Sequence, residues 1–327
     1  MLLKTLKSNQ TYHFILVPVI ALALWTKNFL HPAHFVFHSG ENQMLLYKPI
    51  DLLLTNSPLA DNIVALIFAI LLSFFILRLN AQYTFIRVRT FLAPTLFVFM
   101  TSGVPELHAM HPVYPAALFL ILTIDRIFNA FDKDKIHSDA FEAGFFLAIG
   151  ALFYMELAFF FPLLWIGFTI VRLKVNWRDF ILTTIGFAIP LAAAVGYYLA
   201  SGQFDDLIQI IQTNIFTSQI FLREGLPIQI YVGYLILLTV LGSIFLLSQY
   251  DEKKISTRKY FKVFFWIFLI SVILIFAVPT VSQEIIILSA IPLSYLISNY
   301  LTFMKHQIWG EVFLYVLVAG VVYLQFI

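Results

Sequence analysis

Long runs of apolar residues recur along almost the whole length of this chain, and they constrain its fold more than any other feature. A helix needs about 20 mostly apolar residues to cross a bilayer core of ~30 Å. Soluble domains are about a quarter charged, whereas this chain is 12% charged and 61% hydrophobic, so its excess apolar surface has to face lipid. We predict an all-α, polytopic transmembrane helical bundle of about 11 spans. The predicted spans are residues 11–27, 59–78, 90–103, 114–131, 139–154, 156–172, 179–200, 227–248, 262–280, 284–301 and 309–327.

The basic residues orient these predicted spans. Cytoplasmic segments of membrane proteins carry an excess of lysine and arginine. If the N-terminus is cytoplasmic and the spans alternate, 17 of the 20 basic residues face the cytoplasm, and the three on the outer face are Lys27, Lys48 and Arg223. This asymmetry supports both the orientation and the number of spans. We expect the chain to lie in a cytoplasmic (inner) membrane.

The first apolar run must be weighed against a cleaved signal peptide, because a basic segment precedes it. A signal peptide has one apolar region followed by small residues at the cleavage site. Here Pro18 interrupts the run, and the bulky Leu24 and Trp25 follow the small residues. We therefore expect an uncleaved first span.

One outer connection, residues 201–226, has a helical pattern of its own. Five apolar side chains fall on one face by the i, i+3, i+4, i+7 rule, and acids and amides fall on the other. The apolar set is Phe204, Leu207, Ile208, Ile211 and Ile215, and the polar set is Asp205, Asp206, Gln209 and Gln212. We expect an amphipathic helix in the outer interface of the membrane.

Several kinds of function are excluded by the sequence. The chain has no cysteine, so disulfides, thiolate metal sites and cysteine nucleophiles cannot occur. It has no phosphate-binding loop of the G-x-x-x-x-G-K-[ST] type, and the cytoplasmic connections are too short to hold a nucleotide-binding domain. The net charge of +2 gives no reason to expect nucleic acid as a partner; the lipid bilayer and other membrane proteins are the expected partners.

Polar residues that could carry chemistry gather in the outer connections. The first outer loop contains His31, His34 and His38 with Glu41 and Asp51, and the turn after the third span contains Glu106, His108 and His111. Carboxylate and imidazole can serve as general bases or together hold a divalent metal ion. His34 and His38, or His108 and His111, would share a face on a helix. Histidines are also ordinary residues at a membrane interface, and Pro32 and Pro112 interrupt any helix there, so the cofactor stays open, with a divalent metal ion as one candidate.

Other charged residues lie at or near membrane depth. Glu156 falls at an outer hairpin, and it either faces a polar cavity or simply forms the turn. Asp125 and Arg126 should pair or extend towards the inner boundary. Glu284 should stabilise the start of the tenth span, with Ser282 as the candidate N-cap.

Residues 1–226 resemble the membrane region of GT-C-type integral membrane glycosyltransferases. The similarity lies in a short outer turn followed by Pro115-Ala116-Ala117-Leu118, a basic inner turn, a paired short hairpin and the turn Asn176-Trp177-Arg178-Asp179. The long first outer loop and the expected interfacial helix belong to the same architecture. The whole chain also resembles bacterial multi-pass membrane proteins of unassigned activity. We therefore treat residues 1–327 as one integral membrane domain, with a GT-C-like region at 1–226 and a four-span region at 227–327.

The GT-C resemblance implies a transferase that uses a polyprenyl-phosphate-linked sugar donor at the outer face. By that resemblance Glu41 or Asp51 would be the general base or a metal ligand, Glu106 with His108 or His111 would assist, and Lys48 or Arg223 would bind phosphate. The first outer loop lacks the paired acidic motif of such enzymes. The alternative function is a non-catalytic membrane subunit of a cell-envelope assembly or transport complex, so whether the chain is an enzyme stays open.

Overall fold

A computed structural model describes residues 2–8, 10–37, 40–172, 174, 176–217 and 225–326. Within these ranges the chain is helical and contains no strand. The helices are α1 (Leu2–Lys7), α2 (His13–Leu24), α3 (Thr26–Leu30), η1 (Glu41–Gln43), α4 (Lys48–Leu54), α5 (Pro58–Tyr83), α6 (Leu92–Ser102), η2 (Pro105–His108), α7 (Val113–Asn129), α8 (His137–Phe153), η3 (Met155–Phe160), α9 (Phe161–Val171), α10 (Trp177–Ala200), α11 (Phe204–Phe216), α12 (Leu226–Ser248), α13 (Ile255–Ala277), α14 (Ile285–Phe303) and α15 (Gln307–Leu324).

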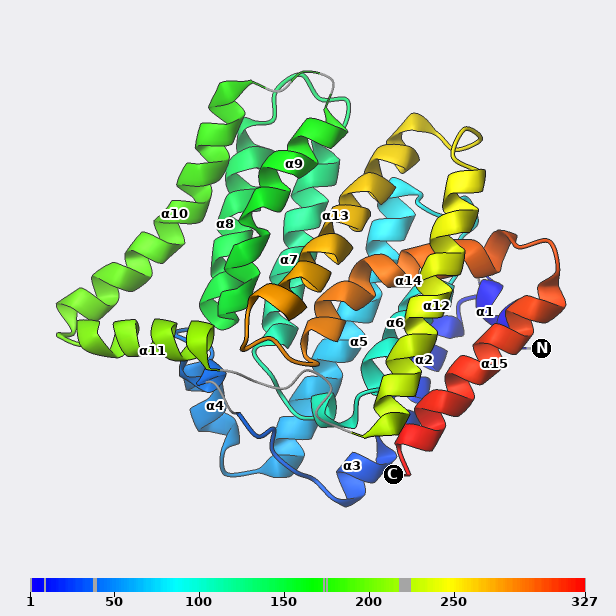
Figure 1. Ribbon diagram of the computed structural model, residues 1–327, viewed down its shortest axis with the longest axis horizontal. Helices are drawn as coiled ribbons and strands as arrows, with labels where there is room; N and C mark the ends of the chain where they lie inside the picture. The colour runs from blue at the N-terminus through cyan, green and yellow to red at the C-terminus, as the bar shows by residue number, and fades with distance from the viewer. Residues whose placement is uncertain are drawn as a thin grey trace.

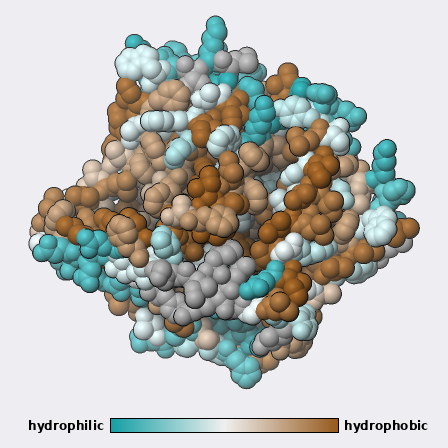
Figure 2. Space-filling view, viewed as in Figure 1, coloured by the Kyte–Doolittle hydropathy of each residue, from teal (hydrophilic) through white to brown (hydrophobic). Residues whose placement is uncertain are grey.

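The long helices form a bundle with two distinct ends (Figure 1). In the part of the chain that the structure describes, six helices are long and apolar enough to cross a membrane: α5, α10, α12, α13, α14 and α15. Hydrophobic residues gather over the middle of the surface, and hydrophilic ones gather towards its upper and lower ends (Figure 2). The protein is therefore a multi-pass helical membrane protein. Each of the eleven predicted ranges overlaps a helix, while the number of spans and their orientation stay predictions.

The core of the bundle lies along α6 and α14. Every residue of α6 is buried, and 78% of the most apolar window of α14 is buried, against 22% for the peripheral α10. On α10, Ile181, Ile185 and Ile189 recur every fourth residue and are exposed, which gives this helix an apolar stripe that can face lipid. A helix as short as α6 needs no such stripe, because neighbouring helices surround it.

The predicted amphipathic helix is confirmed as a helix. It is α11, which follows α10 after a short turn and lies across the lower left end of the bundle (Figure 1). Asp205 and Asp206 lie in its first turn, where negative charge is favourable next to the positive end of the helix dipole. Its place in a membrane interface stays a prediction.

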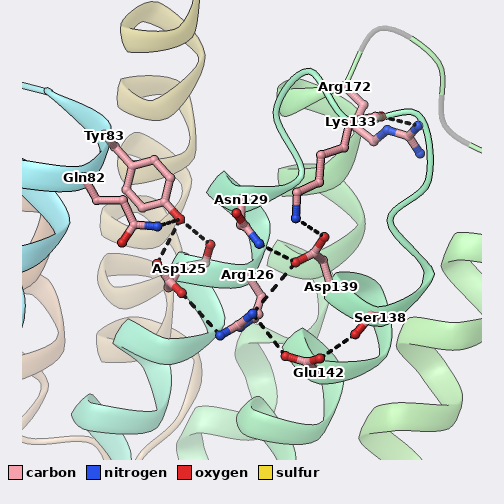
Figure 3. A network of polar contacts seen from close by, with 10 residues as sticks. All are labelled: Gln82, Tyr83, Asp125, Arg126, Asn129, Lys133, Ser138, Asp139, Glu142 and Arg172. Carbon is pink, nitrogen blue, oxygen red and sulfur yellow. Dashed lines mark hydrogen bonds and ion pairs between the residues drawn. The ribbon is translucent and has the colours of Figure 1, made fainter.

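A network of ion pairs holds the end of the bundle opposite to α11 (Figure 3). Arg126 on α7 lies 3.2 Å from Glu142 and 4.0 Å from Asp139, both on α8, and 3.7 Å from its neighbour Asp125. Asp139 also lies 2.9 Å from the Nζ atom of Lys133. Asp125 and Arg126 thus pair as expected, and the network joins α7 to α8 where the chain turns between them.

Candidate functional site

Glu41 and His111 form a buried carboxylate–imidazole pair at the lower end of the bundle. Glu41 begins η1, in the loop between α3 and α4, and His111 lies just before α7. The Nε2 atom of His111 lies 3.0 Å from Oε2 of Glu41, and the two residues are 0% and 2% exposed. The backbone N–H of Val113 donates to Nδ1 of His111 at 3.2 Å. Because Nδ1 accepts, the hydrogen of the neutral ring sits on Nε2 and is donated to Glu41.

Aromatic side chains shield this pair. The ring of Phe35 lies 4.6 Å from that of His111, and the rings of Phe37 and Tyr154 lie 5.8 Å and 5.9 Å from it. Tyr47, which is also buried, donates its hydroxyl to the carbonyl oxygen of Met110 at 2.9 Å. Burial, with the nearby acids as a smaller cause, raises the pKa of the Tyr47 hydroxyl, so this group stays protonated and keeps its hydrogen bond.

Two more buried carboxyl groups lie next to the pair. The hydroxyl of Tyr154 donates to Oε1 of Glu284 at 3.1 Å, and the backbone N–H of Ser282 donates to the same atom at 2.7 Å. Thr280 donates to Oε1 of Glu156 at 3.1 Å, while Oε2 of Glu156 is buried without a partner among the described residues. We call Glu41, His111, Tyr154, Glu156 and Glu284 the acid cluster.

Charge makes the acid cluster unusual for the interior of a membrane protein. Within the described ranges, neither Glu156 nor Glu284 has a lysine or arginine partner. A buried carboxylate without a counter-charge is expensive and tends to take up a proton or a cation. Ionisable residues buried in such proteins mark functional sites more often than structural ones. The acid cluster is therefore the strongest candidate site in the described structure.

Of the predicted site residues in the described ranges, the structure places Glu41 and His111 in direct contact. Asp51, in the first turn of α4, accepts a hydrogen bond from Asn42 at 3.1 Å. Lys48 and Glu106 are exposed at the same end of the bundle. Arg223 lies outside the described residues. Among the described residues, no three His, Asp or Glu side chains form a group that could hold a metal ion.

His108 and His111 do not share a helical face, which their spacing allowed and the expected interruption at Pro112 made doubtful. His108 ends the short helix η2, whereas His111 lies in irregular backbone before α7. Their partners differ as a result, because the ring of His108 stacks on Trp25 at 4.3 Å instead of facing Glu41. A shared helical face for His34 and His38 was the other possibility. His34 lies in irregular backbone, and His38 lies outside the described residues.

Glu156 and Glu284 are the functional candidates that the sequence analysis underrated. Glu284 occupies the N-cap position of α14 that was expected for Ser282, and its side chain makes no capping hydrogen bond. It turns instead to Tyr154 and the Ser282 backbone. The signal available in the sequence was that each glutamate lies among apolar residues at the predicted outer end of a span.

His108 belongs to a separate buried cluster, and this gives a pH prediction. Its Nδ1 lies 2.8 Å from Oδ1 of Asn28, and burial lowers the pKa of His108 to about 3. In the unfolded chain the pKa is about 6.5, so below that pH the unfolded state binds a proton that the folded state excludes. Stability should therefore fall as the pH drops from about 6.5 towards 3, with a loss of about 2 kcal/mol by pH 5. Thermal unfolding of wild-type and His108→Gln protein in detergent, compared at pH 7.5 and pH 5, measures this difference.

The His108→Gln variant should lose less stability on acidification than the wild type, since glutamine does not titrate. His31→Gln serves as the matched control, because His31 is exposed and its replacement should leave the wild-type pH dependence in place. Equal pH dependence of His108→Gln and wild type would contradict the assignment.

Comparison with known proteins gives one match, to the family described as "Family of unknown function (DUF6427)", over residues 119–327. No curated protein and no solved structure matches the chain. The matched region overlaps the part of the chain predicted to be GT-C-like, residues 1–226, and includes the whole four-span region, residues 227–327. The family has no known function, so the match does not test the GT-C resemblance, which stays a prediction. Because the match covers more than half of the chain, the protein belongs to the DUF6427 family, a family of unknown function.

Proposed function

We propose that this membrane protein is a transferase that acts at the end of the bundle carrying the acid cluster, with Glu41 as the general base. It would move a sugar or a related group from a polyprenyl-phosphate carrier to an acceptor hydroxyl at the outer face of a bacterial inner membrane. The observation that carries the proposal is the 3.0 Å contact between Glu41 and His111. A base oriented by a second side chain is the usual arrangement in which a carboxylate removes a proton from a nucleophile.

In the proposed reaction, Glu41 accepts the proton of the acceptor hydroxyl while the hydroxyl oxygen forms a bond to the transferred group. The bond between that group and the carrier phosphate breaks, and the phosphate leaves with the electron pair. His111 is a positioning residue, since its Nε2–H donates to Glu41 while Val113 fixes its other nitrogen. Lys48 and Arg223 would bind the carrier phosphate, and Asp51, Glu106 and His108 would assist from positions around the pair.

A second function, a non-catalytic membrane subunit of an envelope complex, is favoured by a different observation. Glu41 is 2% exposed and His111 is 0% exposed, so a substrate can reach them only if the surrounding loops move. A sealed polar cluster can also serve to specify one packing of the helices. On this view the acid cluster holds the outer loops in place and partner chains bind elsewhere.

Neutralising Glu41 separates these functions. If Glu41 is the base, Glu41→Gln should lower transfer by about 100-fold to 10,000-fold, and the lipid-linked donor should accumulate. The measurement is mass spectrometry of lipid extracts from cells that lack the wild-type gene and carry each variant, with thermal unfolding of the purified protein as a check of folding. Glu252→Gln is the matched control, because Glu252 is exposed at the opposite end of the bundle.

Unchanged lipid profiles in a folded Glu41→Gln protein would contradict the transferase proposal. If, in addition, partner chains that purify with the wild type in fixed ratio are lost from a folded variant, the subunit function is supported.

A further inference from the structure

We propose that a cavity between α12, α13 and α14 binds an anionic phospholipid of the bilayer, with its phosphate at a basic mouth and an acyl chain along apolar walls. The cavity has a volume of about 610 Å³, within the range of about 300–1,000 Å³ that is usual for ligand sites. It lies at the opposite end of the bundle from the acid cluster, and the inference does not depend on the transferase proposal.

The walls of the cavity suit a hydrocarbon chain. α12 and α13 both pack against α14 (Figure 1), and α14 contributes Pro292, Leu293 and Leu296 to the lining. Phenylalanines of α13 and leucines of α12 supply most of the remaining surface. Small side chains, Thr239 and Ser243 on α12, leave room where larger ones would fill the space.

The mouth of the cavity is basic. Arg258 and Lys262, one turn apart on α13, line it together with Tyr250. Both cations lie over the Tyr250 ring, with the Cζ atom of Arg258 5.3 Å and the Nζ atom of Lys262 5.8 Å from its centre. Both charges therefore lie close to one ring, and a phosphate bound beside that ring would meet both.

Arg258 has hydrogen-bonding capacity to spare. Its Nε atom is buried and has no partner among the described residues. Its one ion pair in the described chain is at 3.7 Å to Asp251, a side chain that is fully exposed and therefore a weak competitor in water. A phosphate at the mouth would give the buried N–H an acceptor.

An anionic phospholipid is the ligand that fits both the apolar walls and the basic mouth of the cavity. A free phosphate would gain nothing from the apolar lining, and a neutral lipid would gain nothing from Arg258 and Lys262. Basic pockets between membrane helices at the cytoplasmic side are a known type of site for anionic headgroups. The predicted orientation puts this mouth on the cytoplasmic side, where it can meet lipids of the inner leaflet.

Native mass spectrometry of the full chain in detergent tests the site, with phosphatidylglycerol and phosphatidylcholine of the same acyl chains as probes. Wild type should retain phosphatidylglycerol preferentially. The double variant Arg258→Gln/Lys262→Gln should weaken that retention by about tenfold or more, since each basic residue near a membrane surface contributes roughly a fivefold preference. Arg178→Gln/Lys254→Gln, which removes two exposed charges at the same end, should retain it.

A second pair of variants tests the walls. Ser243→Trp fills the cavity and should abolish retention, whereas Ile244→Trp changes the next residue on α12, which is 60% exposed, and should not. Equal retention of the two lipids by the wild type would overturn the proposal. Equal behaviour of the two charge variants, or of the two tryptophan variants, would overturn it as well.

Discussion

Gly144→Ala should lower the free energy of unfolding by about 3 kcal/mol, at the upper end of the usual range for overpacking. Gly144 lies on α8 where α10 crosses it, and a Cβ atom there would come within 2.1 Å of the backbone oxygen of Thr183. The same crossing holds Gly186 on α10, where a Cβ atom would lie 2.2 Å from the oxygen of Phe141. Backbone atoms cannot rotate away as side chains can, so the helices must move apart.

This close approach explains why two glycines are placed within apolar helices. Small residues allow helix backbones to come together in membranes, where association depends on close packing instead of the hydrophobic effect. Gly186→Ala should therefore destabilise to a similar degree. The double variant should lose less than the sum of the two single losses, because the first change has already separated the helices.

Gly196→Ala is the control, since it also lies on α10 but a Cβ atom there meets nothing within 4 Å. Alanine is favoured over glycine inside helices by about 0.5–1 kcal/mol, so this variant should be slightly more stable than wild type. Thermal unfolding in detergent measures the two single variants, the double variant and the control. If Gly144→Ala and Gly196→Ala shift the midpoint in the same direction, the crossing is looser than the structure indicates.

The helices could be located from the sequence because each apolar run leaves a continuous local signal. The predicted ends of the spans differ from the helix ends where a helix continues into polar residues. The span predicted from Lys262 corresponds to a helix that begins at Ile255, because helical backbone hydrogen bonds extend through Arg258 and Lys259 regardless of hydropathy. The predicted span from Glu156 is a 3₁₀ segment until α9 begins at Phe161, with Pro162 in its first turn, a position that proline favours.

The candidate site was only partly predictable for a different reason. Glu41 and His111 were each recognised as chemically capable, but their contact joins residues 70 positions apart, and nothing local encodes it. Glu284 was assigned to a helix start because its neighbours in sequence fit that role, whereas its partner Tyr154 lies 130 residues away. Spacing in the sequence also suggested a shared face for His108 and His111, which needs a continuous helix that the backbone does not form.

Asp179→Asn should cost about 3–5 kcal/mol, the usual effect of breaking a buried ion pair by removing one partner. Asp179 lies in the first turn of α10 and is 2% exposed. Its Oδ2 lies 2.9 Å from Nη1 of Arg172 and accepts the backbone N–H of Asn176 at 3.2 Å, and its Oδ1 lies 3.0 Å from Nδ1 of His137. An asparagine has one acceptor oxygen, so its amide group would face a donor on one side and leave that donor unsatisfied.

Asp132→Asn is the matched control, because it makes the same change in an exposed residue of the neighbouring connection, where φ is 59° and asparagine is well tolerated. It should change stability by no more than about 0.5 kcal/mol.

Arg172 also donates to the carbonyl oxygens of Lys133 and Asp134, and in Asp179→Asn its charge would face these carbonyl oxygens alone. Because Arg172 loses its carboxylate partner in this variant, both the α7–α8 connection and the start of α10 should become looser. Faster amide exchange in residues 130–136 would reveal the change in the connection. Similar unfolding midpoints for the two variants would mean that Asp179 contributes no more than a surface acid, and that the end of the bundle is held by the network around Arg126.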